Sequence, residues 1–193
     1  MKRPFSLRTA AAAIAAAALI TATTSASATV APIAGAAAAG EIDGPFYIVN
    51  VANNRCLDAV AQGGGANGTK IQLWDCYPPS QFNQMWWRRW QTDSTFELIN
   101  VASGTCLDVP AQSFGLEGTQ LQLWDCYPPN QANQLWRSTL PSHGGRRLQS
   151  VAYAKVADAD AGGLSHNGTK VQIWYFVPEN NNQVWILKRP NEF

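Results

Sequence analysis

The sequence repeats itself with a period of 50 residues. The stretch IQLWDCYPPSQFNQMW at residues 71–86 returns almost unchanged as LQLWDCYPPNQANQLW at 121–136. A third version, VQIWYFVPENNNQVW at 171–185, is one residue shorter. The first two copies agree at 23 of 37 positions over residues 50–86 and 100–136. Because a fixed period is the mark of folds built from repeated units, it constrains the fold before any single residue does.

Each copy contains about four short β-type runs separated by turn-forming residues. In the first copy the runs are Phe46–Asn50, Cys56–Ala59, Ile71–Trp74 and Gln84–Arg88, with turns such as GGGANGT and YPPS between them. Propeller blades also have four strands, but three blades are fewer than the usual 4 to 8. Twelve strands in three equal units instead predict an all-β fold, the closed β-trefoil with pseudo-threefold symmetry.

The chain begins with a segment typical of a secretory signal. Basic residues precede an Ala-rich apolar run from Ala10 to Ile20, and small residues follow as far as Ala28. The apolar run of about 11 residues is too short to span a bilayer, which needs roughly 20. We therefore expect a secreted, extracellular protein with no membrane insertion.

These features predict a simple domain organisation. We expect a signal peptide at residues 1–28, a flexible leader at 29–44 and one trefoil domain at 45–193, with repeats at about 45–92, 93–141 and 142–193. No chain is left over for a second, catalytic domain. We expect a monomer.

The charge balance argues against two classes of partner. Without residues 1–28 the chain has 11 Lys and Arg against 13 Asp and Glu, a net charge of about −2. Nucleic acids and anionic membranes attract clustered positive charge, so we expect neither as a partner. The unrepeated WWRRW at 86–90 is interpreted as a strand end with Arg side chains reaching solvent, in preference to a nucleic-acid site.

Strand parity explains why Trp recurs beside Gln. Successive side chains of a strand point to opposite faces, so Ile71 and Leu73 share one face while Gln72 and Trp74 share the other. If the aliphatic pair lies in the core, Trp74 points outward, and the other copies follow the same rule. The alternative is that a neighbouring loop covers this ring as a satellite core.

The four cysteines predict two disulfides in an exported chain. Of the three possible pairings the repeat favours Cys56 with Cys76 and Cys106 with Cys126. Two steps inward from each cysteine on antiparallel strands would place Asp58 opposite Trp74, with Cβ atoms roughly 5 Å apart. A carboxylate would then lie beside an exposed indole ring.

Such a surface suits a sugar. An aromatic ring offers a platform for the C–H face of a pyranose, an ionised Asp accepts strong hydrogen bonds from hydroxyl groups, and amides both donate and accept. We therefore expect shallow carbohydrate sites. Several weak sites on one protein raise the avidity for a ligand that presents several sugars.

At these residues the chain resembles the ricin B-chain type of β-trefoil lectin, including bacterial carbohydrate-binding modules of that type. The family hallmark, Gln-x-Trp near the end of each repeat, is present as Gln84-Met85-Trp86, Gln134-Leu135-Trp136 and Gln183-Val184-Trp185. The resemblance covers essentially all of residues 45–193. It implies a non-catalytic lectin with no cofactor, binding galactosides or xylan- and arabinose-containing polysaccharides.

The resemblance also implies a set of five sugar-site residues in each repeat. An Asp and an Asn bind hydroxyl groups, a Trp stacks on the ring, one Gln braces the Asp and a second Gln lies at the rim. In this order of Asp, Asn, Trp, bracing Gln and rim Gln, the sets are Asp58, Asn83, Trp74, Gln84 and Gln72; Asp108, Asn133, Trp124, Gln134 and Gln122; and Asp158, Asn182, Trp174, Gln183 and Gln172. The third set is the least complete match, because its repeat lacks both cysteines and one residue before Asn182. Trp86, Trp136 and Trp185 are expected in the core.

Other functions find less support in the sequence. A glycoside hydrolase needs a pair of carboxylates about 5 to 9.5 Å apart, and only one Asp recurs per copy. The cysteines lie 20 residues apart, which is not the spacing of a metal site. The remaining alternative is a β-trefoil that binds or inhibits proteins, which would rely on loops that vary between copies.

Overall fold

The computed structural model describes residues 39–92, 94–127, 131–140, 144–163 and 166–193. The predicted signal peptide and residues 29–38 of the predicted leader lie outside this part of the chain. The described part contains twelve strands and six short 3-10 turns, which confirms the predicted all-β fold. Its helical turns are three residues long, so within these ranges no helix has the length and apolar character to cross a membrane.

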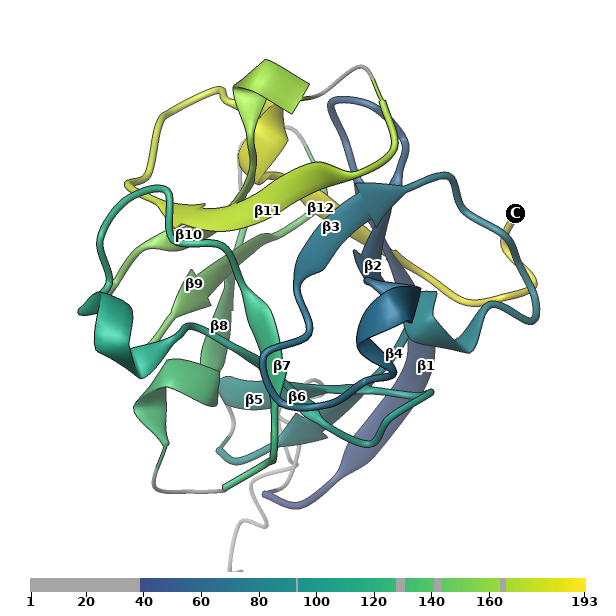
Figure 1. The fold of residues 1–193 in the computed structure, drawn as a ribbon, viewed down its shortest axis with the longest axis horizontal. Coiled ribbons are helices and arrows are strands. Elements are labelled where there is room, and N and C mark those ends of the chain that lie inside the picture. Colours follow the sequence, from purple (N-terminus) through teal and green to yellow (C-terminus); the bar gives the residue numbers. More distant parts are fainter. Residues whose placement is uncertain (1–38, 93, 128–130, 141–143, 164–165) are drawn as a thin grey trace, which may run out of the picture. The chain divides into compact units, whose positions relative to one another are not determined.

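Each repeat contributes four strands and two 3-10 turns in the same order. The first repeat comprises β1 (Ile42–Asn50), β2 (Cys56–Ala59), η1 (Ala61–Gly63), β3 (Ile71–Trp74), η2 (Phe82–Gln84) and β4 (Met85–Trp90). The second comprises β5 (Thr95–Asn100), β6 (Cys106–Asp108), η3 (Ala111–Ser113), β7 (Gln122–Trp124), η4 (Ala132–Gln134) and β8 (Trp136–Thr139). The third comprises β9 (Arg147–Ser150), β10 (Val156–Ala159), η5 (Ala161–Gly163), β11 (Thr169–Trp174), η6 (Asn181–Gln183) and β12 (Trp185–Lys188). In Figure 1 the repeats follow one another from purple-blue through teal to yellow.

The first and fourth strands of the repeats form a closed ring. Strand β1 pairs with β4, β4 with β5, β5 with β8, β8 with β9, and β12 with β1, all antiparallel. An isolated bridge between Arg146 and Trp185 closes the ring next to β9 and β12. The ring is thus closed by strand ladders except between β9 and β12, where this single bridge joins the two ends.

The second and third strands form three hairpins, β2–β3, β6–β7 and β10–β11, which join one another. Strand β11 pairs with β3, while single bridges connect Lys70 with Gln122 and Gln120 with Gln172. The hairpins therefore form a hydrogen-bonded triangle. The strands that carry the predicted sugar-site Asp, Gln and Trp residues all belong to this triangle.

Asparagine side chains fasten two of the three junctions between hairpins. The Asn67 side chain accepts a hydrogen bond from the Asp125 backbone N–H at 2.7 Å and donates to its carboxylate at 2.9 Å. Asn167 makes the same pair of bonds to Asp75, at 2.8 and 2.9 Å. The corresponding position in the second repeat holds Glu117, which pairs with Lys155 at 2.9 Å instead.

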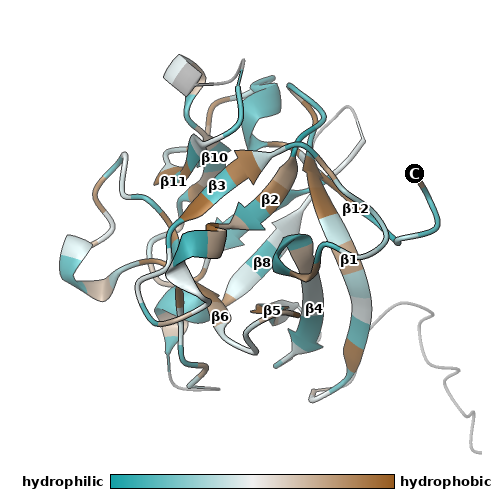
Figure 2. Ribbon diagram, turned by 45° about the vertical axis from the view of Figure 1, so that its right-hand side comes forward, coloured by the Kyte–Doolittle hydropathy of each residue, from teal (hydrophilic) through white to brown (hydrophobic). Residues whose placement is uncertain are grey.

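The core confirms the strand parity predicted from the sequence. Ile71 and Leu73 are fully buried, as are Leu121, Leu123, Val171 and Ile173 at the corresponding positions. The three hallmark tryptophans, Trp86, Trp136 and Trp185, are also fully buried. Each indole N–H donates at 3.1 Å to a backbone carbonyl of its own repeat. Figure 2 shows hydrophobic and hydrophilic residues interspersed along β1, β2 and β3.

The first strand begins earlier than the sequence predicted. Strand β1 includes residues 42–44, which the sequence predicts to be part of the leader, and Asp43 pairs with Arg88 of β4. The Arg88 guanidinium binds the Asp43 carboxylate and lies 4.5 Å from the Trp90 ring. The strand extends because the longer β4, which contains WWRRW, offers it partners beyond Trp86.

Both predicted disulfides are present. Cys56 is bonded to Cys76 and Cys106 to Cys126, each across 20 residues of sequence. In the third repeat Val156 and Phe176 occupy the cysteine positions. There the exposed Phe176 ring lies 4.6 Å from the guanidinium carbon of Arg147.

Candidate functional site

Each repeat holds one buried carboxylate that is surrounded by side-chain amides. In the first repeat, Asp58 on β2 accepts hydrogen bonds from Gln72 at 2.9 Å on Oδ1, and from Asn83 at 2.9 Å and Gln84 at 3.1 Å on Oδ2. Only 3% of Asp58 is exposed. Because Oδ1 accepts one amide bond and Oδ2 two, Oδ1 retains capacity for a ligand hydroxyl.

The strand register corrects one prediction. Asp58 lies directly opposite Gln72, while Trp74 lies opposite Cys56, so Asp58 and Trp74 are diagonal neighbours on the same face. The expected position was wrong because Cys76 lies two residues beyond the end of β3 and does not pair with Cys56 in the ladder. Gln72 is accordingly a hydrogen-bond partner of the carboxylate, and it also lines the cavity beside it.

The Gln of each Gln-x-Trp motif ties the carboxylate to the loop that follows the third strand. Gln84 donates to Asp58 and to the Asp75 carbonyl at 2.9 Å, and its Oε1 accepts from the Tyr77 backbone N–H at 3.0 Å. Gln134 and Gln183 make the corresponding three bonds in their repeats. Both N–H donors of each buried amide are therefore used within the protein, which makes it a bracing residue, as the resemblance implied.

A shallow cavity lies beside the carboxylate in the first repeat. It has a volume of about 200 Å³, and its lining includes Asp58, Gln72, Trp74 and Asn83. The Trp74 side chain is 36% exposed, so its ring is partly open to solvent and is not covered as a satellite core would be. The acid, the amides and the indole ring therefore surround the same space.

The second repeat reproduces this arrangement. Asp108 accepts from Gln122 at 2.9 Å, Asn133 at 2.8 Å and Gln134 at 3.1 Å. A cavity of about 160 Å³ lies between this cluster and Trp124, which is 37% exposed. The two sites are thus built alike from corresponding residues.

The third repeat differs in one contact and in the environment of its ring. Asp158 accepts from Gln172 at 3.0 Å and from Gln183 at 3.1 Å. Within the described ranges the Asn182 side chain makes no hydrogen bond to this carboxylate. Trp174 is less exposed than its counterparts and lies against Tyr175, with ring centroids 5.6 Å apart. Two of the three sites are therefore complete.

Burial changes the acidity of the three carboxyl groups. Loss of hydration raises the pKa of Asp58 and Asp158 above the usual range and raises that of Asp108 to about 6. The surrounding amide donors act in the opposite direction, because they stabilise the ionised form. At neutral pH Asp108 is therefore mostly ionised and able to accept hydrogen bonds from a ligand.

Sequence reasoning missed two further residues of each complete site. Gln62 and Gln81 line the cavity of the first repeat, and Gln112 and Gln131 line that of the second. Their identity at an offset of 50 residues was the available signal. Gly162 and Asn180 stand at these positions in the third repeat.

The side chains of the two cavities determine what kind of ligand they can bind. Across the described ranges no three His, Cys, Asp or Glu side chains gather into a metal site. Each of the two cavities is lined by a single carboxylate. This arrangement can bind a neutral, hydroxyl-rich ligand.

Comparison with solved structures shows the same fold. The designed threefold symmetric protein ThreeFoil superimposes with a TM-score of 0.67 and 23% sequence identity, over 75% of this chain and 98% of that chain. The Macrolepiota procera ricin B-like lectin in complex with lactose gives a TM-score of 0.63 and 22% identity, over 80% and 99% of the two chains. An exo-β-1,3-galactanase from Clostridium thermocellum gives 0.65 and 25% identity over 75% of this chain, which spans only 30% of that enzyme.

Sequence comparison identifies the family. No curated protein sequence matches the chain. The family profile described as "Ricin-type beta-trefoil lectin domain-like" matches residues 37–124 and 83–174, which together cover more than half of the chain. The chain belongs to the ricin-type β-trefoil lectin-like family.

Proposed function

We propose that this protein is a non-catalytic carbohydrate-binding protein with one shallow sugar site per repeat. The observation that carries the proposal is the repeated cluster of a buried Asp, its amide donors and a partly exposed Trp around one cavity. In the first two repeats all five predicted residues occupy this cluster. The third repeat has fewer contacts and is proposed to be the weakest site.

The cluster divides the work of recognition between its members. The carboxylate accepts hydrogen bonds from neighbouring hydroxyl groups, and the Asn amide, whose donors are used by Asp58 and the Ala59 carbonyl, offers its oxygen. The indole ring covers the apolar face of the pyranose. Since the amides already bind the carboxylate, the site is organised before the sugar arrives, which reduces the entropy lost on binding.

The sugar class proposed is a galactoside, with xylan- or arabinose-containing polysaccharide as the next choice. Two structural relatives support the first, because one is a lectin in complex with lactose and the other an enzyme named for its action on galactan. A single shallow site is expected to bind with a dissociation constant near 1 mM, or about −4 kcal/mol. Several sites acting together raise avidity for a multivalent surface about 10² to 10⁴-fold.

We also propose where the protein acts. Two disulfides indicate folding in an oxidising compartment, and the N-terminal segment has the order of a secretory signal. We propose that the protein is secreted and acts outside the cell as a monomer. A single carboxylate per cavity supports binding without hydrolysis.

Isothermal titration calorimetry with galactose, lactose and xylose, together with a glycan array, tests the function. We expect millimolar binding of at least one sugar, with no release of reducing sugar from galactan or xylan over hours. Trp74→Ala and Trp124→Ala should each remove one site and leave the circular dichroism spectrum unchanged. Failure of every sugar to bind would refute the proposal, and unfolding of both variants would show that these rings belong to the core.

A further inference from the structure

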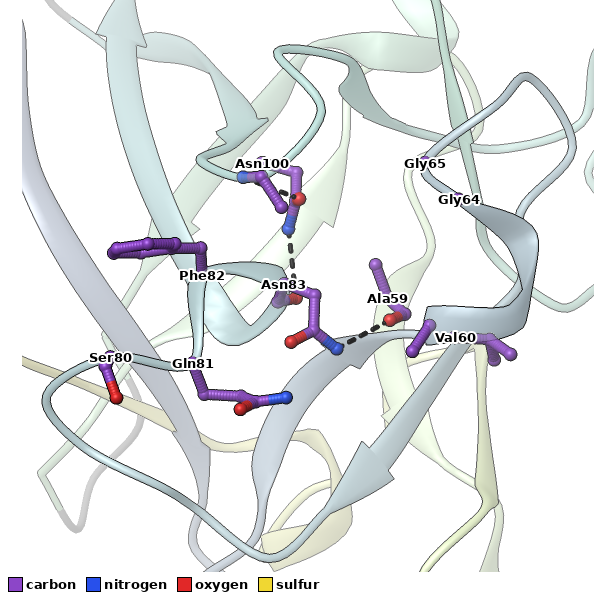
Figure 3. A pocket seen from close by; sticks show the side chains of 11 residues that line it. Ala59, Val60, Gly64, Gly65, Ser80, Gln81, Phe82, Asn83 and Asn100 are labelled. Carbon is purple, nitrogen blue, oxygen red and sulfur yellow. Dashed lines mark hydrogen bonds between the residues drawn. The ribbon is translucent and has the colours of Figure 1, made fainter.

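A second cavity adjoins the sugar site of the first repeat. It has a volume of about 380 Å³ and lies between η2 and the glycines that follow η1, with the turn after β5 at its back. Figure 3 shows Phe82 and Gln81 on one side of this space and Gly64 and Gly65 on the other. The volume falls within the range of small-molecule sites and is large enough for one sugar unit.

The two cavities share a wall. Ala61, Gln81 and Asn83 line both of them. The Asn83 Nδ2 group donates to Asp58 and, at 2.8 Å, to the Ala59 carbonyl, while no described residue donates to its Oδ1. This oxygen, at the boundary between the cavities, can accept from a ligand on either side.

The lining of the second cavity matches a neutral, hydroxylated ligand. None of its eleven lining residues is charged, and its polar side chains are those of Ser80, Gln81, Asn83 and Asn100. The Phe82 ring is 55% exposed and provides an apolar surface for the C–H face of a sugar. An anionic or cationic ligand would find no opposite charge there.

The shape of the cavity depends on a glycine. Gly65 has φ +74°, and a Cβ atom at this position would lie 2.3 Å from the Cβ of Ser103. A larger residue would push the loop and its neighbour apart. The loop after η1 can therefore lie close to the second repeat, and this loop forms the wall of the cavity opposite Phe82.

An aromatic side chain at the position of Phe82 is present in the first repeat only. Ala132 and Asn181 occupy the positions that correspond to Phe82, at the start of η4 and η6. The second repeat has its exposed phenylalanine, Phe114, at the position of Gly64 instead. The aromatic ring on the η2 side of this cavity therefore has no counterpart in the second repeat.

We propose that this cavity is a second sugar subsite, so that the first repeat binds two consecutive units of a glycan chain across the Gln81–Asn83 boundary. The inference rests on the proposed function and extends it from single sugars to oligosaccharides. Asp58 and Trp74 hold the first unit, while Phe82, Ser80 and Gln81 hold the second. The first repeat should then prefer chains over monosaccharides, and the second repeat should show less preference.

The test uses a background in which only the first repeat binds, made by Trp124→Ala and Trp174→Ala. Calorimetry with galactose and β-1,4-galactotetraose, and with xylose and xylotetraose, gives the ratio of tetrasaccharide to monosaccharide affinity. We expect a ratio of about tenfold, falling to about threefold or less in Phe82→Ala, a change in the range of one aromatic contact. Phe82→Tyr should retain the ratio because it keeps the ring, and Phe114→Ala is the matched control for loss of an exposed phenylalanine.

The outcomes separate the subsite from the function as a whole. Monosaccharide binding that persists in Phe82→Ala together with a lowered ratio supports the subsite. An unchanged ratio with intact monosaccharide binding overturns the subsite and leaves the lectin function standing. Failure of every monosaccharide and oligosaccharide tested to bind the wild-type protein overturns both. Melting temperatures measured alongside exclude unfolding as the cause of a lowered ratio.

Discussion

The first two repeats and the third contain the same five kinds of predicted site residue but hold them differently. Asn83 and Asn133 donate to the carboxylates of their repeats. In the third repeat the loop before η6 is one residue shorter, and the Asn180 side chain accepts from the Asn182 backbone N–H at 3.0 Å. Asn182 gives Asp158 no hydrogen bond within the described ranges. Whether a site is complete therefore depends on the path of the loop that carries the Asn as well as on the identity of the residues.

Removing a disulfide should have the largest effect. It tests how much the bridges, which the third repeat lacks, stabilise the first two repeats. The double change Cys56→Ala with Cys76→Ala frees a loop of 20 residues and should lower the free energy of unfolding by about 3 kcal/mol. Urea denaturation at neutral pH measures the loss. The third repeat manages without a bridge, so a loss below about 1 kcal/mol would mean that the first two repeats also depend little on theirs.

Removal of the indole ring separates the complete sites from the incomplete one. Trp124→Ala should weaken binding at the second repeat about 30-fold, or about 2 kcal/mol, because the sugar loses its platform. Trp174→Ala should change total binding far less. Calorimetric stoichiometry with lactose measures both. Equal losses from the two changes would contradict the ranking of the sites.

Acidification should weaken sugar binding at the second repeat without unfolding the protein. The pKa of Asp108 is about 6, so at pH 5 only about a tenth of this group is ionised, and the affinity of the site should fall about tenfold. The raised pKa means that the folded state binds this proton more readily than the unfolded state does. Between pH 6 and the usual carboxyl range, falling pH therefore increases the contribution of Asp108 to stability.

Titration of lactose into a variant in which only the second repeat binds, from pH 7.5 to 5, measures the acid effect. Thermal melts at the same pH values serve as the control. Affinity that stays constant to pH 5 would show that the Asp108 carboxylate does not contact the ligand. A parallel fall in melting temperature would attribute the loss to unfolding.

Replacing Gly162 and Asn180 by the glutamines of the complete sites should give the smallest effect, a gain. Gly162→Gln with Asn180→Gln supplies the residues that line the complete sites and should strengthen the third site about threefold. The space allows the change at Gly162, where a Cβ atom would lie 3.7 Å from the Asp160 Oδ1 in ordinary contact. Binding measured after Trp74→Ala and Trp124→Ala isolates this repeat. If the affinity of the third site does not rise, the position of Asn182 is the cause of its weaker binding instead.

The sequence was a good guide to the fold because the fold follows from periodicity. The 50-residue repeat predicted the trefoil, and strand parity predicted both the buried Ile71 and Leu73 and the outward Trp74. These predictions need only the alternation of side chains along a strand. They do not depend on which residues face each other across strands.

The predictions that were wrong concern how strands pair and how long their partners are. Local sequence patterns do not specify either. The register between β2 and β3 placed Gln72, not Trp74, opposite Asp58, because the disulfide forms beyond the end of the ladder. The start of β1 at Ile42 depended on the length of β4, a distant partner. The second cavity likewise arises where the loop after η1 meets the second repeat, a contact between segments far apart in the chain.

The hydrogen-bonded triangle of hairpins has a consequence for recognition at surfaces. Because β3, β7 and β11 are joined to one another through Leu73–Thr169, Lys70–Gln122 and Gln120–Gln172, the backbone fixes the distances between the three proposed sugar sites. Binding through the three proposed sites would therefore favour glycans whose branches recur at that separation over the same sugars at other spacings.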